Sequence, residues 1–299
     1  MIELLDRQHD QRPAVVMVPG LAATAEFFGA AVSRLAARHR VVVVELPGHG
    51  DNSTAGRPAS LAHAVAQLHT TIDELGLTDI TLLGWSLGAT VTYGYLERFG
   101  TDRVRRLVSV EQTPRLLVDD DWPYGAFGAL DAAGASAIVQ SVTSDYPAFA
   151  AGLVRNSFAA ADGEDTADTK DAGDGEDSGA VDTAGDGDTA ADRGGPDPAT
   201  LSVLTDEACD CEPDAVAALL REAIAADWRD RIRSIPVPTL LIHGTRSQVY
   251  PGDLGRWLRD AIPQARLEMF DHSGHLPFVE EPDRFARTVA AFVGDPVGT

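Results

Sequence analysis

Short valine-rich runs that alternate with helical patterns restrict this chain to a small number of folds. These runs lie at residues 14–18, 41–46, 80–83, 104–110, 239–243 and 266–270. Continuous apolar runs of this length, bounded by glycine and proline, are typical of strands that are buried on both faces of a parallel sheet. Between them, apolar residues recur at helical spacing, as in residues 61–75, where Ser60 can cap the helix. The alternation predicts an α/β fold with a mostly parallel, doubly wound sheet.

The strand pattern stops between residues 112 and 233, and helical spacing resumes only at residues 214–228. Residues 161–198 hold 13 acidic and two basic side chains and almost no large apolar ones. Such a segment buries too little apolar surface to offset the entropy lost on ordering, so we interpret it as a disordered acidic insertion. The sequence therefore predicts one α/β core, residues 1–111 and 234–299, interrupted by a helical lid at residues 112–233.

Charge and composition exclude several classes of function. The 299 residues carry a formal net charge of -22, which opposes binding to nucleic acid. No stretch approaches the ~20 apolar residues of a membrane span, and the first residues lack the apolar segment of a secretory signal. Two cysteines, Cys209 and Cys211, cannot build a disulfide framework. We therefore expect a cytoplasmic protein without a nucleic-acid or membrane partner.

A serine between two glycines is the sharpest chemical signal. The segment GWSLG, residues 84–88, lies between the run at 80–83 and a helical pattern that ends near Phe99. A tight strand-to-helix turn needs small neighbours, and it exposes its central side chain beside the N-terminus of the helix. The context predicts that Ser86 is a nucleophile.

A serine hydroxyl is a weak nucleophile and needs a base. His275 lies in a loop directly after the last apolar run, where active-site residues of parallel α/β sheets gather. His272 is the competing base, whereas His49 is better explained as a turn residue. No histidine pair has metal-ligand spacing with a carboxylate, so no metal site is expected.

Two backbone amides are candidates for the oxyanion hole that such chemistry requires. The amide of Leu87 follows Ser86 directly. The amide of Leu21 follows Gly20 in the loop after the run at residues 14–18, where glycine lets the backbone approach a substrate.

The chain resembles the α/β-hydrolase fold family over residues 14–111 and 238–293, through VPGLAATAEFF, ELPGHGDNS, LLGWSLGATV, LLIHGTRSQVYP and HSGHLPFVEEPDRF, in that order. Within the family it is similar to esterases, lactonases and cofactor-free haloperoxidases that carry a lid between two strands. The resemblance implies the order nucleophile, acid, histidine and no cofactor. A serine nucleophile also excludes haloalkane dehalogenase and epoxide hydrolase chemistry, which use aspartate at this place.

One position departs from the family pattern. After residues 239–243 the family usually has a carboxylate, but this chain has Ser247 there. Some members carry the acid at the end of the preceding sheet strand, where this chain has Glu111, and we expect Glu111 to orient His275. Asp253 and the absence of any third member remain alternatives. If position 247 is merely vacated, Ser247→Asp alone should change little.

These residues predict a serine hydrolase that cleaves a carboxylic ester or lactone through an acyl-enzyme. The substrate is expected to be a small molecule, with its binding site formed by Trp85, Trp122, Tyr124 and Phe127. A haloperoxidase or perhydrolase that uses the same triad is one alternative. The other is a ligand-binding protein that kept the pocket and lost turnover, which the missing aspartate favours.

Overall fold

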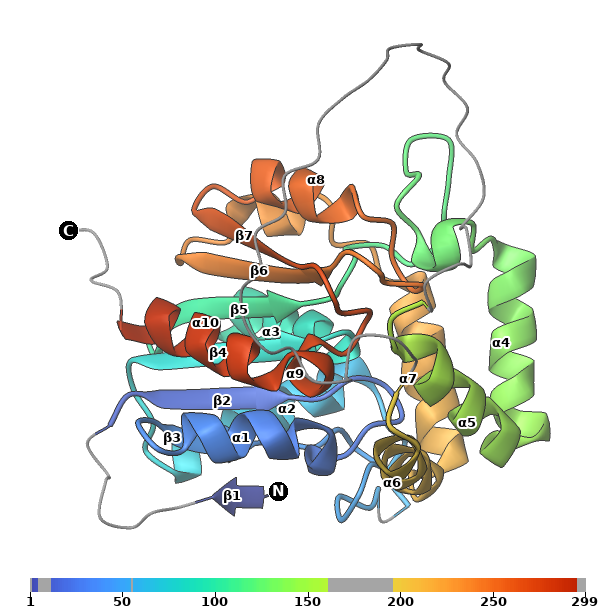
Figure 1. The fold of residues 1–299 in the computed structure, drawn as a ribbon, viewed down its shortest axis with the longest axis horizontal. Helices are drawn as coiled ribbons and strands as arrows, with labels where there is room; N and C mark the ends of the chain where they lie inside the picture. Colours follow the sequence, from blue (N-terminus) through green and yellow to red (C-terminus); the bar gives the residue numbers. More distant parts are fainter. Residues whose placement is uncertain (1, 5–11, 55, 161–195, 295–299) are drawn as a thin grey trace, which may run out of the picture.

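The computed structural model describes residues 2–4, 12–54, 56–160 and 196–294. Within these residues one sheet has the strand order β1-β3-β2-β4-β5-β6-β7 (Figure 1). Its strands are β1 (Ile2–Leu4), β2 (Ala14–Val18), β3 (Arg40–Val43), β4 (Ile80–Trp85), β5 (Val104–Val110), β6 (Thr239–Gly244) and β7 (Ala265–Phe270). All neighbours pair in parallel except β1, which runs antiparallel to β3 at the edge. The predicted mostly parallel α/β sheet is confirmed, and β1 is an addition that its short run did not signal.

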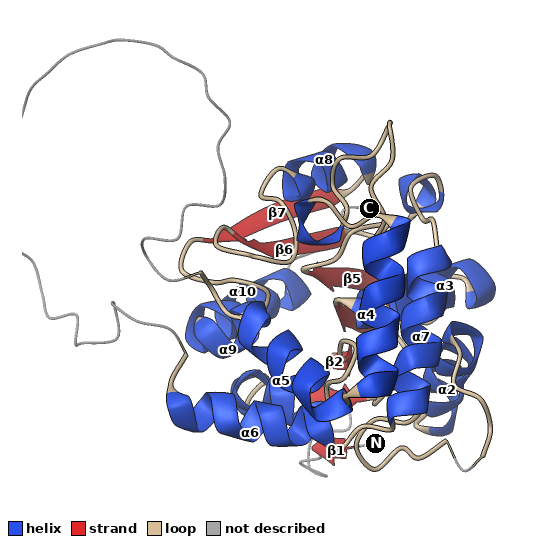
Figure 2. Cartoon of the chain, turned by 90° about the vertical axis from the view of Figure 1, so that its right-hand side faces the viewer, coloured by secondary structure: helices blue, strands red, loops and turns tan. Residues whose placement is uncertain are grey.

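Helices cover both faces of the sheet. On one face lie α1 (Gly29–Leu35) and α10 (Pro282–Gly294) (Figure 1), and Figure 2 shows α10 on one side of the strands. The core cluster on the other face includes α2 (Leu61–Glu74), α3 (Leu87–Phe99) and α8 (Leu254–Ala261).

The strand β2 shows why the apolar runs are continuous. Val15 and Met17 pack in the cluster with α1 and α10, whereas Val16 and Val18 pack in the cluster with α2 and α3. Successive side chains of a strand point to opposite faces, so a strand covered on both faces needs apolar residues at every position.

Four further helices lie together beyond the carboxyl ends of the parallel strands (Figure 1). They are α4 (Ala132–Ser144), α5 (Tyr146–Ser157), α6 (Pro198–Cys209) and α7 (Pro213–Ala225). The disordered insertion was predicted for residues 161–198, of which 161–195 lie outside the described residues, so its disorder stays a prediction. At its end the Asp197 carboxylate caps α6 by accepting a hydrogen bond of 3.0 Å from the Thr200 amide.

The short elements connect this framework. They are η1 (Ala25–Phe28), η2 (Ala126–Gly128), η3 (Arg231–Ser234) and α9 (Pro277–Glu280). Near the C-terminal end of the described residues, α9 and α10 are separated by a break at Glu281. Pro282 explains the break, since proline disfavours helical backbone in the residue before it and is well suited to start a helix.

A buried histidine holds the loop after β2. His49 accepts a hydrogen bond of 3.0 Å at Nε2 from the amide of Ala22, and its Nδ1 lies 3.1 Å from the carbonyl oxygen of Pro47. Ala22 has φ 52°, a left-handed conformation that a non-glycine residue adopts only under constraint. Burial lowers the pKa of His49 to about 4, although the hydrogen bond to Pro47 opposes the shift. The neutral imidazole is therefore part of the fold and keeps this loop in place.

This contact predicts a specific pH dependence of stability. Below an ordinary histidine pKa of 6.5 the unfolded chain binds a proton that the folded protein excludes until pH about 4. The His49 contribution to the free energy of unfolding is therefore complete above pH 6.5 and falls as the pH is lowered, by about 2 kcal/mol at pH ~5. Urea unfolding of wild type and His49→Gln at pH ~7.5 and ~5 should show the gap between them shrinking at the lower pH. An equal gap at both pH values would contradict the assignment.

Candidate active site

Ser86 lies on a strained turn between β4 and α3. Its backbone has φ 52° and ψ -124°. A Cβ at Gly84 would lie 2.4 Å from the Cα of Ala89, and a Cβ at Gly88 would lie 2.1 Å from the carbonyl oxygen of Val18. Neither position has room for a side chain, which is why the turn reads G-x-S-x-G. The arrangement presents Ser86 at the N-terminus of α3.

Two residues that the sequence analysis missed support this turn. The Gln112 side-chain amide donates to the carbonyl oxygen of Ser86 at 2.7 Å and to the hydroxyl of Thr90 at 2.8 Å. Its oxygen accepts a 2.7 Å hydrogen bond from the hydroxyl of Tyr250. Burial raises the pKa of Tyr250, so this phenol stays protonated as a donor. The strained backbone is thus fixed by side chains from two neighbouring loops.

Glu111 follows β5 directly and contacts His275. Its side chain is fully buried, and its Oε2 lies 2.9 Å from Nδ1 of His275. The same oxygen accepts a 2.7 Å hydrogen bond from the hydroxyl of Ser247, while Oε1 accepts one of 2.8 Å from the amide of Gly244. Glu111 has φ 47°, so the chain turns sharply where the strand ends.

A second histidine, His243, lies against the same carboxylate. Its Nδ1 is 3.4 Å from Oε1 of Glu111, and its side chain is 3% exposed. The sequence analysis missed this neighbour, although the sheet register contained the signal: Val110 pairs with Ile242, so the next residues of the two strands come side by side.

The charge of Glu111 is maintained despite its burial. Burial alone would raise the pKa of this carboxyl, but its interactions with His243 and His275 lower the pKa to about 2. A buried carboxylate is tolerated when donors satisfy both oxygens, as they do here. Glu111 can therefore stabilise positive charge on His275.

The loop that carries His275 is held at three points. The amide of His275 donates to the carbonyl oxygen of Ser157 at 2.7 Å, and the carbonyl oxygen of His275 accepts a 2.9 Å hydrogen bond from the indole of Trp85. Glu280 accepts hydrogen bonds from the amides of Gly274 at 2.8 Å and Ala159 at 2.7 Å. Burial raises the pKa of Glu280 to about 7, while these donors oppose the shift.

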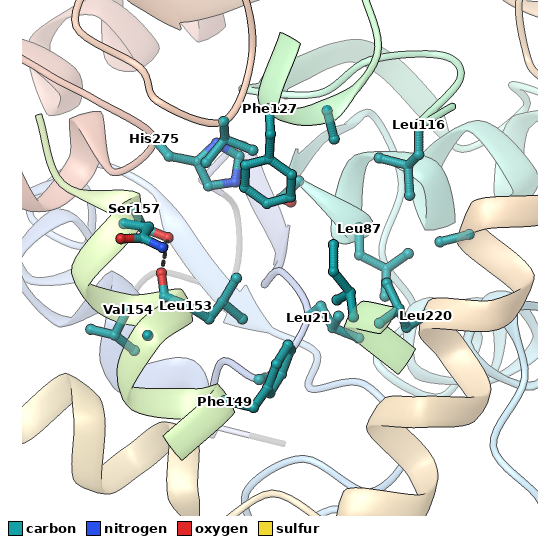
Figure 3. A pocket seen from close by; sticks show the side chains of 18 of the residues that line it. Leu21, Leu87, Leu116, Phe127, Phe149, Leu153, Val154, Ser157, Leu220 and His275 are labelled. Atoms are coloured by element: carbon teal, nitrogen blue, oxygen red, sulfur yellow. Dashed lines mark hydrogen bonds between the residues drawn. The ribbon is translucent and has the colours of Figure 1, made fainter. Parts of the chain in front are cut away.

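Ser86 and His275 both line a cavity of about 560 Å³. Its wall includes the predicted Leu21, Leu87, Trp85 and Phe127. Further apolar side chains come from α5 and α7, namely Phe149, Leu153, Val154 and Leu220, and Leu116 is added by the segment after β5 (Figure 3). Among the described residues that line it, none is a lysine or arginine. The volume is that of an ordinary small-molecule site.

Two predicted binding residues, Trp122 and Tyr124, are not among the residues that line this cavity. Trp122 is 1% exposed and packs edge-on against Trp257 of α8, with ring centroids 4.7 Å apart. Tyr124 packs against Trp122 at 5.2 Å, and Arg229 lies over the Trp122 ring. These rings are core between the segment after β5 and α8, so they do not line the cavity.

The alternative acid Asp253, the alternative base His272 and the nearby Asp271 are all exposed, unlike the buried Glu111 and His275. Asp253 pairs with Arg256, and its side chain is 73% exposed. Asp271 is 67% exposed and lies 3.6 Å from Arg284. His272 is exposed, and its amide is directed to Glu281.

No cluster of three His, Cys, Asp or Glu side chains within the described residues has an arrangement that could bind a metal ion. Among the helices they form, none has the length and apolar character needed to cross a membrane.

Comparisons with known proteins agree with this architecture. The chain is 28% identical over 274 residues to a pimeloyl-[acyl-carrier protein] methyl ester esterase of Nitrosomonas europaea, covering 91% of this chain and 92% of that one. In structure it is similar to an esterase from Exiguobacterium antarcticum, with TM-score 0.77, 23% identity and coverage of 95% and 92%. It is also similar to a bromoperoxidase from Bacillus anthracis, with TM-score 0.78, 22% identity and coverage of 95% and 93%.

The family model of the alpha/beta hydrolase family matches residues 15–288, which span the sheet, the turn at Ser86, Glu111 and the His275 loop. This chain belongs to the alpha/beta hydrolase family.

Proposed function

We propose that this protein is a serine hydrolase that cleaves a carboxylic ester or lactone through an acyl-enzyme. The observation that carries the proposal is the 2.9 Å contact between buried Glu111 and His275, in a loop that borders the same cavity as Ser86. The names of the relatives add support, since curated proteins that match over nearly the whole chain are methyl ester esterases. The geometry needs no cofactor for this reaction.

In the first step the Ser86 oxygen attacks the carbonyl carbon of the ester. Because Nδ1 of His275 faces Glu111, its Nε2 is left to take the serine proton. The ionised Glu111 stabilises the imidazolium that forms. The amides of Leu21 and Leu87 are suited to hold the oxyanion, as both residues border the cavity.

Collapse of the intermediate breaks the bond to the alcohol, which leaves with the proton from His275. Water then gives a proton to His275 and adds to the acyl carbon. Expulsion of Ser86, which recovers the proton, releases the acid. Every step uses the same base and the same oxyanion donors.

The cavity favours an uncharged and largely apolar substrate. Its wall is built mainly from apolar side chains, and its described members include Asp145 but no lysine or arginine that could pair with an anionic substrate. We assign the lid function to α4, α5 and α7, which contribute Ile138, Phe149, Leu153, Leu220 and Ile224 to that wall. p-Nitrophenyl esters of graded chain length, tested beside lactones and beside peroxide-dependent bromination, separate ester hydrolysis from the haloperoxidase alternative.

Replacement of the nucleophile gives the most direct prediction. Ser86→Ala removes the attacking oxygen, so kcat for p-nitrophenyl esters should fall at least ~10⁴-fold and labelling by a fluorophosphonate should disappear. The matched control is Ser157→Ala, another serine of the cavity wall, whose hydroxyl bonds to the carbonyl oxygen of Leu153 at 2.8 Å. That variant should keep its labelling. Labelling that persists in Ser86→Ala would refute the nucleophile assignment.

Replacement of the acid tests the proposed role of Glu111. Glu111→Gln keeps the length of the side chain but loses the charge that stabilises the imidazolium, so turnover should drop by up to ~10⁴-fold. Asp253→Asn, at the exposed alternative acid, should retain wild-type turnover. Circular dichroism of both variants checks that they are folded. Near-full activity of a folded Glu111→Gln would exclude Glu111 as the triad acid.

A further inference from the structure

Ser247 lies at the position where the family usually has a carboxylate, and its hydroxyl contacts the carboxylate of Glu111. Its hydroxyl lies 2.7 Å from Oε2 of Glu111, the same oxygen that is 2.9 Å from Nδ1 of His275. One carboxylate oxygen thus contacts both the imidazole and this serine. We propose that Ser247 is a positioning residue that fixes the direction of the Glu111 carboxylate toward His275. The inference rests on the proposed function, because it assigns a role within the same triad.

The hydrogen bonds around Ser247 determine which way its proton points. The amides of Val249 and Tyr250 both lie 3.3 Å from the hydroxyl oxygen and donate to it. A serine hydroxyl has two acceptor lone pairs and one proton. Since both lone pairs face amides, the proton is directed to Glu111. Ser247 is therefore a fixed donor to the carboxylate rather than a free surface hydroxyl.

The direction of the carboxylate depends on this donor. Gly244 binds Oε1 at 2.8 Å, and Ser247 binds Oε2 at 2.7 Å. These two donors define the plane of the carboxylate independently of His275, whereas without Ser247 the only close partner of Oε2 among the described residues is the imidazole that the carboxylate has to orient. A fixed plane keeps Oε2 against Nδ1 of His275 and so keeps the base in the correct orientation.

The contact also changes the expectation for an aspartate at this position. In Ser247→Asp a carboxylate would face Glu111 at hydrogen-bond distance, and two carboxylates so close cannot both ionise. While the two carboxyl groups share a proton, the introduced side chain can donate to Glu111 as the serine hydroxyl does. When that proton leaves at higher pH, repulsion displaces Glu111. The sequence-based expectation of little effect is therefore replaced by a loss of activity that grows with pH.

The experiment compares variants that differ in hydroxyl donation. Ser247→Ala and Ser247→Cys remove or weaken the donor and should lower kcat about 10- to 100-fold, as expected for losing a hydrogen bond to a charged group. KM should change little, because Ser247 is not among the residues that line the cavity. Ser247→Thr keeps the hydroxyl and should retain most of kcat. The matched control is Gln248→Ala in the same loop, which loses a 3.2 Å hydrogen bond to the carbonyl oxygen of Phe158 and should behave as wild type.

A second readout does not depend on turnover. The Nδ1 proton of His275 should give a downfield proton NMR signal that moves in Ser247→Ala and Ser247→Cys but stays in Ser247→Thr and Gln248→Ala. Ser247→Asp should lose activity as the pH rises through a range where the wild type does not. If Ser247→Ala and Ser247→Cys keep both wild-type kcat and the wild-type signal while Glu111→Gln is inactive, the inference fails and the proposed function stands. If Ser86→Ala or Glu111→Gln remains active, the proposed function itself fails.

Discussion

The buried negative charge of Glu111 is the interaction on which this end of the molecule depends. A carboxylate without exposure to solvent is costly unless donors reach both oxygens, and here they come from β6 and from the loops that follow β6 and β7. The sheet supplies the alignment, since the amide of Glu111 donates to the carbonyl oxygen of Ile242 at 2.9 Å. The pairing of two parallel strands therefore decides which histidines can share the charge.

Backbone strain at the candidate site occurs next to the pairing of β5 with β6. Ser86 and Glu111 both have positive φ, each at the end of a central strand, and the amide of Ser86 donates to the carbonyl oxygen of Val110 at 2.9 Å. Such backbone conformations cost about 1–3 kcal/mol each and persist only where the surroundings determine them. Here the surroundings are a sheet buried on both faces, which cannot adjust locally. The directions of the Ser86 and Glu111 side chains are therefore set by backbone that the rest of the sheet keeps fixed.

Features that depend on neighbours in the sequence could be predicted, and features that depend on contacts between distant segments could not. The continuous apolar runs and the glycines around Ser86 are local constraints, so the sheet and the turn could be predicted. The position of Trp122 could not, because an aromatic side chain in this region suits a pocket or a core equally, and only packing on the distant Trp257 decides. The contact of Ser247 with Glu111 was missed for the same reason. Both residues were singled out in the sequence, but the distance between their side chains depends on segments that come together only in the folded chain.

Hydrogen bonds also connect the end of α5 to the loop that carries His275. The amide of His275 ends on the carbonyl oxygen of Ser157, the last residue of α5, and Glu280 joins the amides of Gly274 and Ala159 through one carboxylate. Gly274 also has no room for a Cβ, which would lie 2.5 Å from the amide nitrogen of Ala159. Movement of the end of α5 would therefore displace the backbone of His275 and leave the half-buried Glu280 without one of its donors. The end of α5 and the His275 loop are thus expected to move together, although they are far apart in the sequence and α5 forms part of the cavity wall.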